Sequence, residues 1–173
     1  MVQKWMYSVT AIALLASSAL LPVGNAFAQQ AAPELVGTWD LVLVDNILPD
    51  GTRSHLYGPN PHGVLMFDAG GHYSLEIMSA GRPKFTANDK SKGTPDEYRA
   101  AVQGSNCHFG TYIINALDHT VTLYVEHATF ANWEGAALTW PFTVAGDEAK
   151  LIVPHPTTGS PGVTGEIVWK RIH

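Results

Sequence analysis

Apolar and polar residues alternate in short runs along most of the chain beyond residue 35. Between residues 120 and 128, Val121, Leu123 and Val125 fall on one face of an extended chain. His127 continues the same face, and the positions between these residues are more polar. A period of two residues is typical of β-strands whose two faces lie in different environments. The sequence therefore predicts a strand here with an apolar face that ends in a histidine.

Segments rich in Gly, Pro and Asp, such as 49–51 and 68–71, separate these runs at short intervals and predict turns. In the first run, Trp39, Leu41 and Leu43 share one face of an extended chain. Nine strands are predicted in all, near residues 36–45, 53–57, 63–68, 72–79, 107–115, 120–129, 137–145, 149–154 and 163–171.

One helix is predicted after residue 94. Thr94 and Glu97 have the spacing of a capping box, and Pro95 stands at the first helical position. Gly104 suits the end of the helix. The polar stretch 79–93 before it predicts a long loop, which in a compact domain indicates a lid or a mobile edge.

Many antiparallel strands and one short helix, without any internal repeat, define the expected fold. We expect an all-β protein, an antiparallel up-and-down β-barrel of about eight to nine strands. Closure of the sheet is the economical arrangement because it removes exposed strand edges.

Residues 1–28 have the features of a secretory signal peptide. Lys4 provides a positive charge, an apolar run extends over 9–21, and 26–28 form an A-x-A cleavage site. The apolar run is too short for a transmembrane helix, which needs about 20 residues. The sequence therefore predicts export to the periplasm or the extracellular space, no membrane span, and one domain over 29–173.

Charge and cysteine content narrow the choice of partners and of stabilising bonds. Without Lys4, nine basic residues stand against 15 acidic ones, a net charge of −6. Nucleic acid is therefore not an expected partner. Cys107 is the single cysteine, so no disulfide can form within the chain, and a small buried hydrophobe is its expected role.

Short motifs spread over the chain resemble the bacterial and fungal lipocalin-like domain family, in the family's order. They are Leu35-Val36-Gly37-Thr38-Trp39, Tyr57-Gly58-Pro59, Gly63-Val64-Leu65-Met66-Phe67, Gly71-His72-Tyr73-Ser74, Arg82-Pro83-Lys84-Phe85, Gly93-Thr94-Pro95-Asp96-Glu97-Tyr98, Phe109-Gly110-Thr111-Tyr112, Asn132-Trp133 and Val168-Trp169-Lys170-Arg171. The resemblance implies a barrel that encloses a cavity, with Trp39 at its closed end. Related barrels include ligand carriers and cofactor-free enzymes such as decarboxylases and cyclases, so the fold alone does not define an activity.

Two histidines depart from the pattern that the resemblance implies. His108 stands where an aromatic residue is expected, and His127 where a small residue is expected. Motifs of metalloproteases, α/β-hydrolases and nucleotide-binding proteins are missing from the sequence. We expect no cofactor, and no metal site because the histidines lack short ligand spacing.

Five residues are candidate ligand contacts. His127 could orient a guest among apolar neighbours, or be a satisfied, partly buried histidine, and Glu126 could tune it. Tyr73 could donate a hydrogen bond to a ligand. Trp133 could flank the mouth of the cavity or fold over the barrel edge. Arg82 could meet an anionic guest at the entrance, or anchor a surface loop through an acidic residue.

Two main functions are compatible with these residues. The first is binding of a small hydrophobic or aromatic molecule in the barrel cavity. The alternative is a cofactor-independent lyase, isomerase or cyclase in which His127 and His108 move protons and Tyr112 donates a hydrogen bond. The pairing requires both histidines to face inward, which the sequence does not determine. A weaker third possibility is a surface that binds another envelope protein, and the oligomeric state is open.

Overall fold

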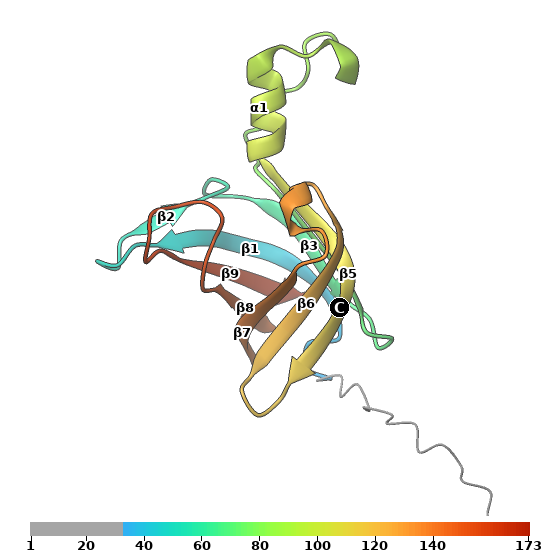
Figure 1. Ribbon diagram of the computed structural model, residues 1–173, viewed down its shortest axis with the longest axis vertical. Helices are drawn as coiled ribbons and strands as arrows, with labels where there is room; N and C mark the ends of the chain where they lie inside the picture. Colours follow the sequence, from blue (N-terminus) through green and yellow to red (C-terminus); the bar gives the residue numbers. More distant parts are fainter. Residues whose placement is uncertain (1–32) are drawn as a thin grey trace, which may run out of the picture.

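The computed structural model describes residues 33–173, and the expected signal peptide lies outside them. Nine antiparallel strands form one sheet in which neighbours along the chain are mostly neighbours in space. β1 also pairs with β9, so eight strands close into a barrel and β2 adds a short ninth strand beside β1 (Figure 1). The predicted all-β barrel with one α-helix is confirmed.

The strands lie close to their predicted positions. They are β1 (Gly37–Ile47), β2 (Arg53–His55), β3 (His62–Phe67), β4 (His72–Met78), β5 (Ser105–Asn115), β6 (Thr120–Ala128), β7 (Ala137–Ala145), β8 (Glu148–Val153) and β9 (Thr164–Arg171).

Aromatic side chains and an arginine fill the end of the barrel where β1 begins. Trp39 and Trp169 are completely buried. The Arg171 guanidinium lies 4.0 Å from the centre of the Trp39 ring and donates to the Val36 carbonyl at 2.9 Å. Trp39 Nε1 donates to the Leu35 carbonyl at 2.9 Å, which satisfies the one polar group of the side chain. This end of the barrel is therefore a packed core.

An irregularity in β1 changes which residues face the interior. Leu41 is paired with Trp169, but Leu43 is paired with Val168, so Val42 is an extra residue and is 46% exposed. A β-bulge of this kind reverses the alternation beyond it. Leu43, expected on the face of Trp39 and Leu41, is therefore displaced from it, and Val44 takes the buried position.

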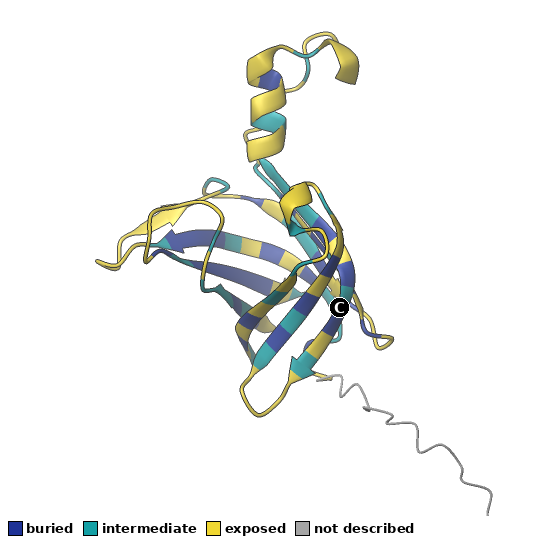
Figure 2. Ribbon diagram, in the orientation of Figure 1, coloured by how far each residue is buried: buried dark blue, intermediate teal, exposed yellow. Residues whose placement is uncertain are grey.

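Residues 79–104, which we call the arm, project from the barrel between β4 and β5 (Figure 1). The arm contains α1 (Pro95–Gln103) and a short 3-10 turn (Lys90–Lys92), and most of it is exposed (Figure 2). None of its residues lines the cavity described below. No helix in the described part of the chain is long and apolar enough to cross a bilayer.

The predicted capping box organises the arm. The Thr94 hydroxyl accepts from the Glu97 amide at 3.2 Å, and the Glu97 carboxylate accepts from the Thr94 amide at 2.7 Å. The same carboxylate accepts from the amide and the hydroxyl of Thr86, both at 2.8 Å. These hydrogen bonds, led by the one from the Thr94 amide, lower the pKa of Glu97 to about 2. One carboxylate thus ties the loop to the first turn of α1.

We expect Glu97→Gln to loosen the arm and leave the barrel folded, because a neutral amide oxygen is a weaker acceptor than a carboxylate. The folded-state pKa of Glu97 lies below its ordinary 4.5, so its contribution is present above that pH and is lost as the pH falls towards about 2. Amide hydrogen exchange at Thr86 and Thr94 should be faster in the variant near neutral pH. The difference should disappear near pH 2.

Asp96→Asn is the matched control, since the Asp96 carboxylate is exposed and contacts Arg99 at 3.0 Å. It should leave exchange at Thr86 and Thr94 nearly unchanged. Equal exchange rates in wild type and Glu97→Gln at neutral pH would contradict the role of this carboxylate.

Candidate functional site

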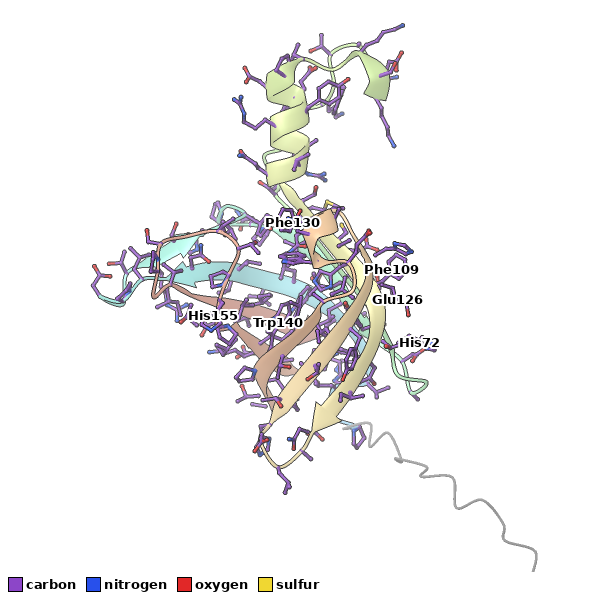
Figure 3. The ribbon with its side chains drawn as sticks, viewed as in Figure 1. His72, Phe109, Glu126, Phe130, Trp140 and His155 are labelled. Carbon is purple, nitrogen blue, oxygen red and sulfur yellow. The ribbon has the colours of Figure 1, made fainter. Side chains whose placement is uncertain are left out.

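A cavity opens at the end of the barrel opposite the packed Trp39 and Trp169. The volume of this cavity is about 100 Å³. Its wall is largely aromatic and aliphatic, and includes Tyr57, Ile77, Trp133, Leu138, Trp140 and Ile167. Its polar side chains are Asn46, Asn106, His155, Thr157 and Thr158. Figure 3 places Trp140 within the barrel and His155 towards the rim formed by the segment after β8.

A charged cluster holds β2 against the outside of the barrel rim. Arg53 donates to Asp45 at 3.1 Å and to Glu166 at 2.8 Å, and these two carboxylates are directly opposite each other on β1 and β9. His55 Nδ1 lies 2.7 Å from Asp45. The hydrogen bond from Arg53 lowers the pKa of Glu166. The cluster fixes the start of the segment that brings Tyr57 to the cavity wall.

Two further contacts position the rim. The Asn46 side-chain amide donates to the Thr158 carbonyl at 3.2 Å, which ties the loop after β8 to β1. Trp133 ends the short 3-10 turn Ala131–Trp133, and its ring meets Phe130 edge-on with centroids 5.3 Å apart. The cavity wall therefore combines strands with loops that are held by specific hydrogen bonds.

His108 is a deeply buried polar side chain near the cavity, with 2% of its surface exposed. Its Nδ1 lies 2.9 Å from the Tyr73 hydroxyl. The edges of Trp133 and Trp140 contact its ring, with centroids 5.6 and 6.2 Å away. Two buried atoms in this region have no hydrogen-bond partner, His108 Nε2 and Asn106 Oδ1.

Burial decides the charge state of this pair. It lowers the pKa of His108 to about 4 and raises the pKa of Tyr73. At neutral pH the imidazole is therefore uncharged and the phenol keeps its proton. The pair presents neutral hydrogen-bonding groups to its surroundings.

His127 does not face the cavity, contrary to the alternation in the sequence. Gly110 is paired with Val125, but Phe109 is paired with His127, so Glu126 is an extra residue in β6. The bulge reverses the alternation, and the His127 side chain is 70% exposed. Figure 3 shows Phe109 and Glu126 on the outer side of the barrel wall.

Gly110 permits the bulge because a Cβ atom there would lie 2.0 Å from the Tyr124 carbonyl oxygen. Outside the barrel, His127 Nδ1 lies 3.4 Å from a carboxylate oxygen of Glu134. Ala128 takes the position opposite the buried His108. The two histidines thus lie on opposite sides of the wall and cannot form the acid–base pair that the catalytic alternative requires.

The other predicted contacts separate into two groups. Trp133 lines the cavity, and Tyr73 lies beneath it as the partner of His108. Glu126 is exposed on the outer face and Arg82 is exposed in the arm, where its Nε donates to the Ser79 carbonyl at 3.3 Å. Neither lines the cavity. The loop anchor at Arg82 is a backbone carbonyl rather than an acidic side chain.

Two residues have roles other than the expected ones. Tyr112 is buried towards the packed end of the barrel, where its hydroxyl donates to the Asp68 carbonyl at 2.8 Å. Its ring packs against the Phe67 ring, with the two centroids 4.7 Å apart. Along β5, Tyr112 is the next inward-facing residue after Gly110, in the direction away from the cavity. Cys107 is half-buried and lies directly opposite Glu76, an exposed residue of β4.

The cavity residues that were not expected from the sequence include Asn106, Tyr57 and Trp140. Asn106 is two positions before His108, so it shares its face, but the strand was predicted to begin only at residue 107. Trp140 lies in a predicted strand, with alternation as the available signal. Tyr57 lies in a motif of the family resemblance, and no local pattern places it at the cavity.

Comparisons with known proteins give one strong match. A family model described as "Lipocalin-like domain" matches residues 36–172. Among solved structures, a redesigned beta barrel is similar at 15% identity and a TM-score of 0.39, covering 81% of this chain and 93% of that chain. No curated protein matches the chain.

We expect His108→Gln to flatten the dependence of stability on pH. The folded-state pKa of about 4 is below the ordinary 6.5, so the unfolded chain takes up the proton first and stability falls as the pH drops from 6.5 to about 4. By about pH 5 this effect should approach about 2 kcal/mol in the wild type and be absent in the variant.

Urea unfolding at a series of pH values, followed by tryptophan fluorescence, measures this difference. The other histidines are present in both proteins, so they cancel in the comparison. Parallel curves of unfolding free energy against pH for the two proteins would contradict the buried, neutral state of His108.

Proposed function

Because the chain belongs to the lipocalin-like domain family, we propose that it binds a small hydrophobic or aromatic molecule in the cavity at the open end of its barrel. The observation that carries this proposal is the composition of the cavity wall. Aromatic and aliphatic residues predominate there, with a few polar groups among them. Binding sites for small molecules have this composition, since apolar surface supplies affinity and a few polar groups fix orientation.

The size and charge of the cavity narrow the choice of guest. An apolar protein cavity of about 150 Å³ holds one benzene molecule, so a cavity of about 100 Å³ encloses most of one ring, and the rest of the guest extends through the mouth. None of the residues that line it, all within 33–173, is Lys, Arg, Asp or Glu. An uncharged guest is therefore favoured over an ion.

The catalytic alternative has less support. His127 lies outside the barrel wall, which leaves the buried His108 beside the cavity and His155 at its rim, with no contact between the two among the described residues. A group whose pKa lies near 4 is a weak general base at neutral pH. No contact in the described residues favours a lyase, isomerase or cyclase over simple binding.

We further propose that the protein acts outside the cytoplasm, in the periplasm or the extracellular space. Lys4, the apolar run over 9–21 and the A-x-A site at 26–28 support this location.

Filling the cavity should abolish binding. Leu138→Trp replaces an aliphatic side chain that lines the cavity from β7 with a larger aromatic one. We therefore expect it to reduce affinity for toluene at least tenfold, as measured by isothermal titration calorimetry. Thr143→Trp, on the exposed face of the same strand, is the matched control and should bind as the wild type does. Equal affinity in all three proteins would contradict binding in this cavity.

Expression in a bacterial host with its precursor intact should yield a processed protein that begins at Gln29. N-terminal sequencing of the periplasmic and culture fractions tests this. Ala28→Asp should block processing, because cleavage requires a small residue at this position. Recovery of the full-length chain from the cytoplasm in both cases would contradict export.

A further inference from the structure

Two unpaired polar side-chain atoms belong to β5, one on a residue that lines the cavity and one on a residue that contacts its Trp133 and Trp140. Asn106 Oδ1 and His108 Nε2 are buried and have no hydrogen-bond partner. A buried polar group without a partner loses the hydrogen bonds it made to water and destabilises the fold. Both atoms therefore point to a partner that joins the protein after folding.

Their placement brings both atoms within reach of one small group. Asn106 and His108 are two positions apart on β5, so they project from the same inner face at a spacing of about 6.6 Å along the strand. Asn106 lines the cavity, and the Trp133 and Trp140 rings that contact His108 line it too. Two hydrogen bonds of about 2.8 Å that share one atom span at most about 5.6 Å, so the two side chains have to converge by about 1 Å from their spacing along the strand.

The other contacts of each side chain determine whether its unpaired atom is a donor or an acceptor. Burial raises the pKa of Tyr57, and a hydrogen bond with the Asn106 side chain opposes this rise. A donor to the phenol oxygen has this effect, so we assign the Asn106 amide nitrogen as the donor, which leaves Oδ1 as an acceptor. The Tyr73 hydroxyl is hydrogen-bonded to His108 Nδ1, and we assign the tautomer in which the phenol donates and Nδ1 accepts. In a neutral imidazole the other nitrogen then carries the hydrogen, which makes Nε2 a donor directed away from Tyr73.

We propose that the guest carries a neutral hydroxyl group, as a phenol does, which donates to Asn106 Oδ1 and accepts from His108 Nε2. This inference rests on the proposed function and specifies the chemical class of the ligand. One hydroxyl satisfies both orphaned atoms because it is a donor and an acceptor at once. The ring attached to it occupies the apolar part of the cavity between Trp140 and Leu138.

Other polar groups fit these atoms less well. A carboxylate has no hydrogen to donate to Asn106 Oδ1, and no Lys or Arg among the lining residues compensates its charge. An ammonium group has no acceptor for the Nε2 hydrogen of His108. An ether accepts from His108 but leaves Asn106 Oδ1 unpaired. A water molecule could bridge the two atoms without any ligand, and the experiment distinguishes this case.

The test compares three one-ring probes with the mature protein by isothermal titration calorimetry: phenol, anisole and toluene. Phenol can make both hydrogen bonds, anisole one, and toluene none. We expect the wild type to bind phenol about tenfold more tightly than anisole, although anisole is the more apolar molecule. This comparison requires no substitution, so it holds even where a variant fails to fold.

Variants locate the effect. Asn106→Leu should weaken phenol binding about tenfold relative to toluene, and His108→Gln, which keeps a side-chain N–H donor, should weaken it less. Thr143→Val changes an exposed polar residue of β7, outside the cavity, to one of the same shape and is the matched control. It should leave the ratio of phenol to toluene affinity unchanged.

Three outcomes are distinguishable. A loss of phenol preference in Asn106→Leu but not in Thr143→Val supports the hydroxyl site. Binding of toluene and anisole at least as tight as that of phenol, with no change in Asn106→Leu, overturns it and leaves the cavity as an apolar binding site whose orphaned atoms are bridged by water. Absence of binding for all three probes overturns both the hydroxyl site and the proposed function.

Discussion

The pairing of the first strand with the last is the constraint on which the rest of the structure depends. Trp39 and Arg171 stand opposite each other at one end of this seam, and Ile47 and Thr164 at the other. Without the seam, β1 and β9 would each present an unpaired edge, and the sheet would have no enclosed side. Closure gives every strand an inner and an outer face. The same seam then separates a packed end, filled around Trp39, from an end that remains open.

Local sequence patterns predicted most of the fold, because strands and helix caps depend mainly on residues that are close together in the sequence. Alternation and turn residues located all nine strands, and the spacing of Thr94 and Glu97 located the helix with its cap. The inner face was predictable only where a strand is regular. The bulges at Val42 and Glu126 depend on the register of a partner strand distant in sequence, and each reversed the alternation that follows. Leu43 and His127 were misplaced for this one reason.

The candidate site was harder to predict than the fold because its properties belong to no single segment. Trp133 was recognised as a candidate lining residue, and Tyr73 as a hydrogen-bonding residue, from their types and positions. The role of Asn106 depends on Tyr57, which is 49 positions earlier in the chain, and on a missing partner, which only a packed structure reveals. His108 is neutral because the whole barrel wall excludes water from it. Chemistry of this kind arises from burial, which a linear pattern does not record.

The bulge at Glu126 has a consequence for how related chains are compared. One residue is looped out between Val125 and His127, so a residue-by-residue alignment with an unbulged strand goes out of step by one position at this point. The residue that occupies the inward place opposite His108 is Ala128, not His127. The small side chain that the family resemblance implies here is therefore present, one position later. Against an unbulged strand, a gap of one residue inside the strand brings the inward positions back into correspondence.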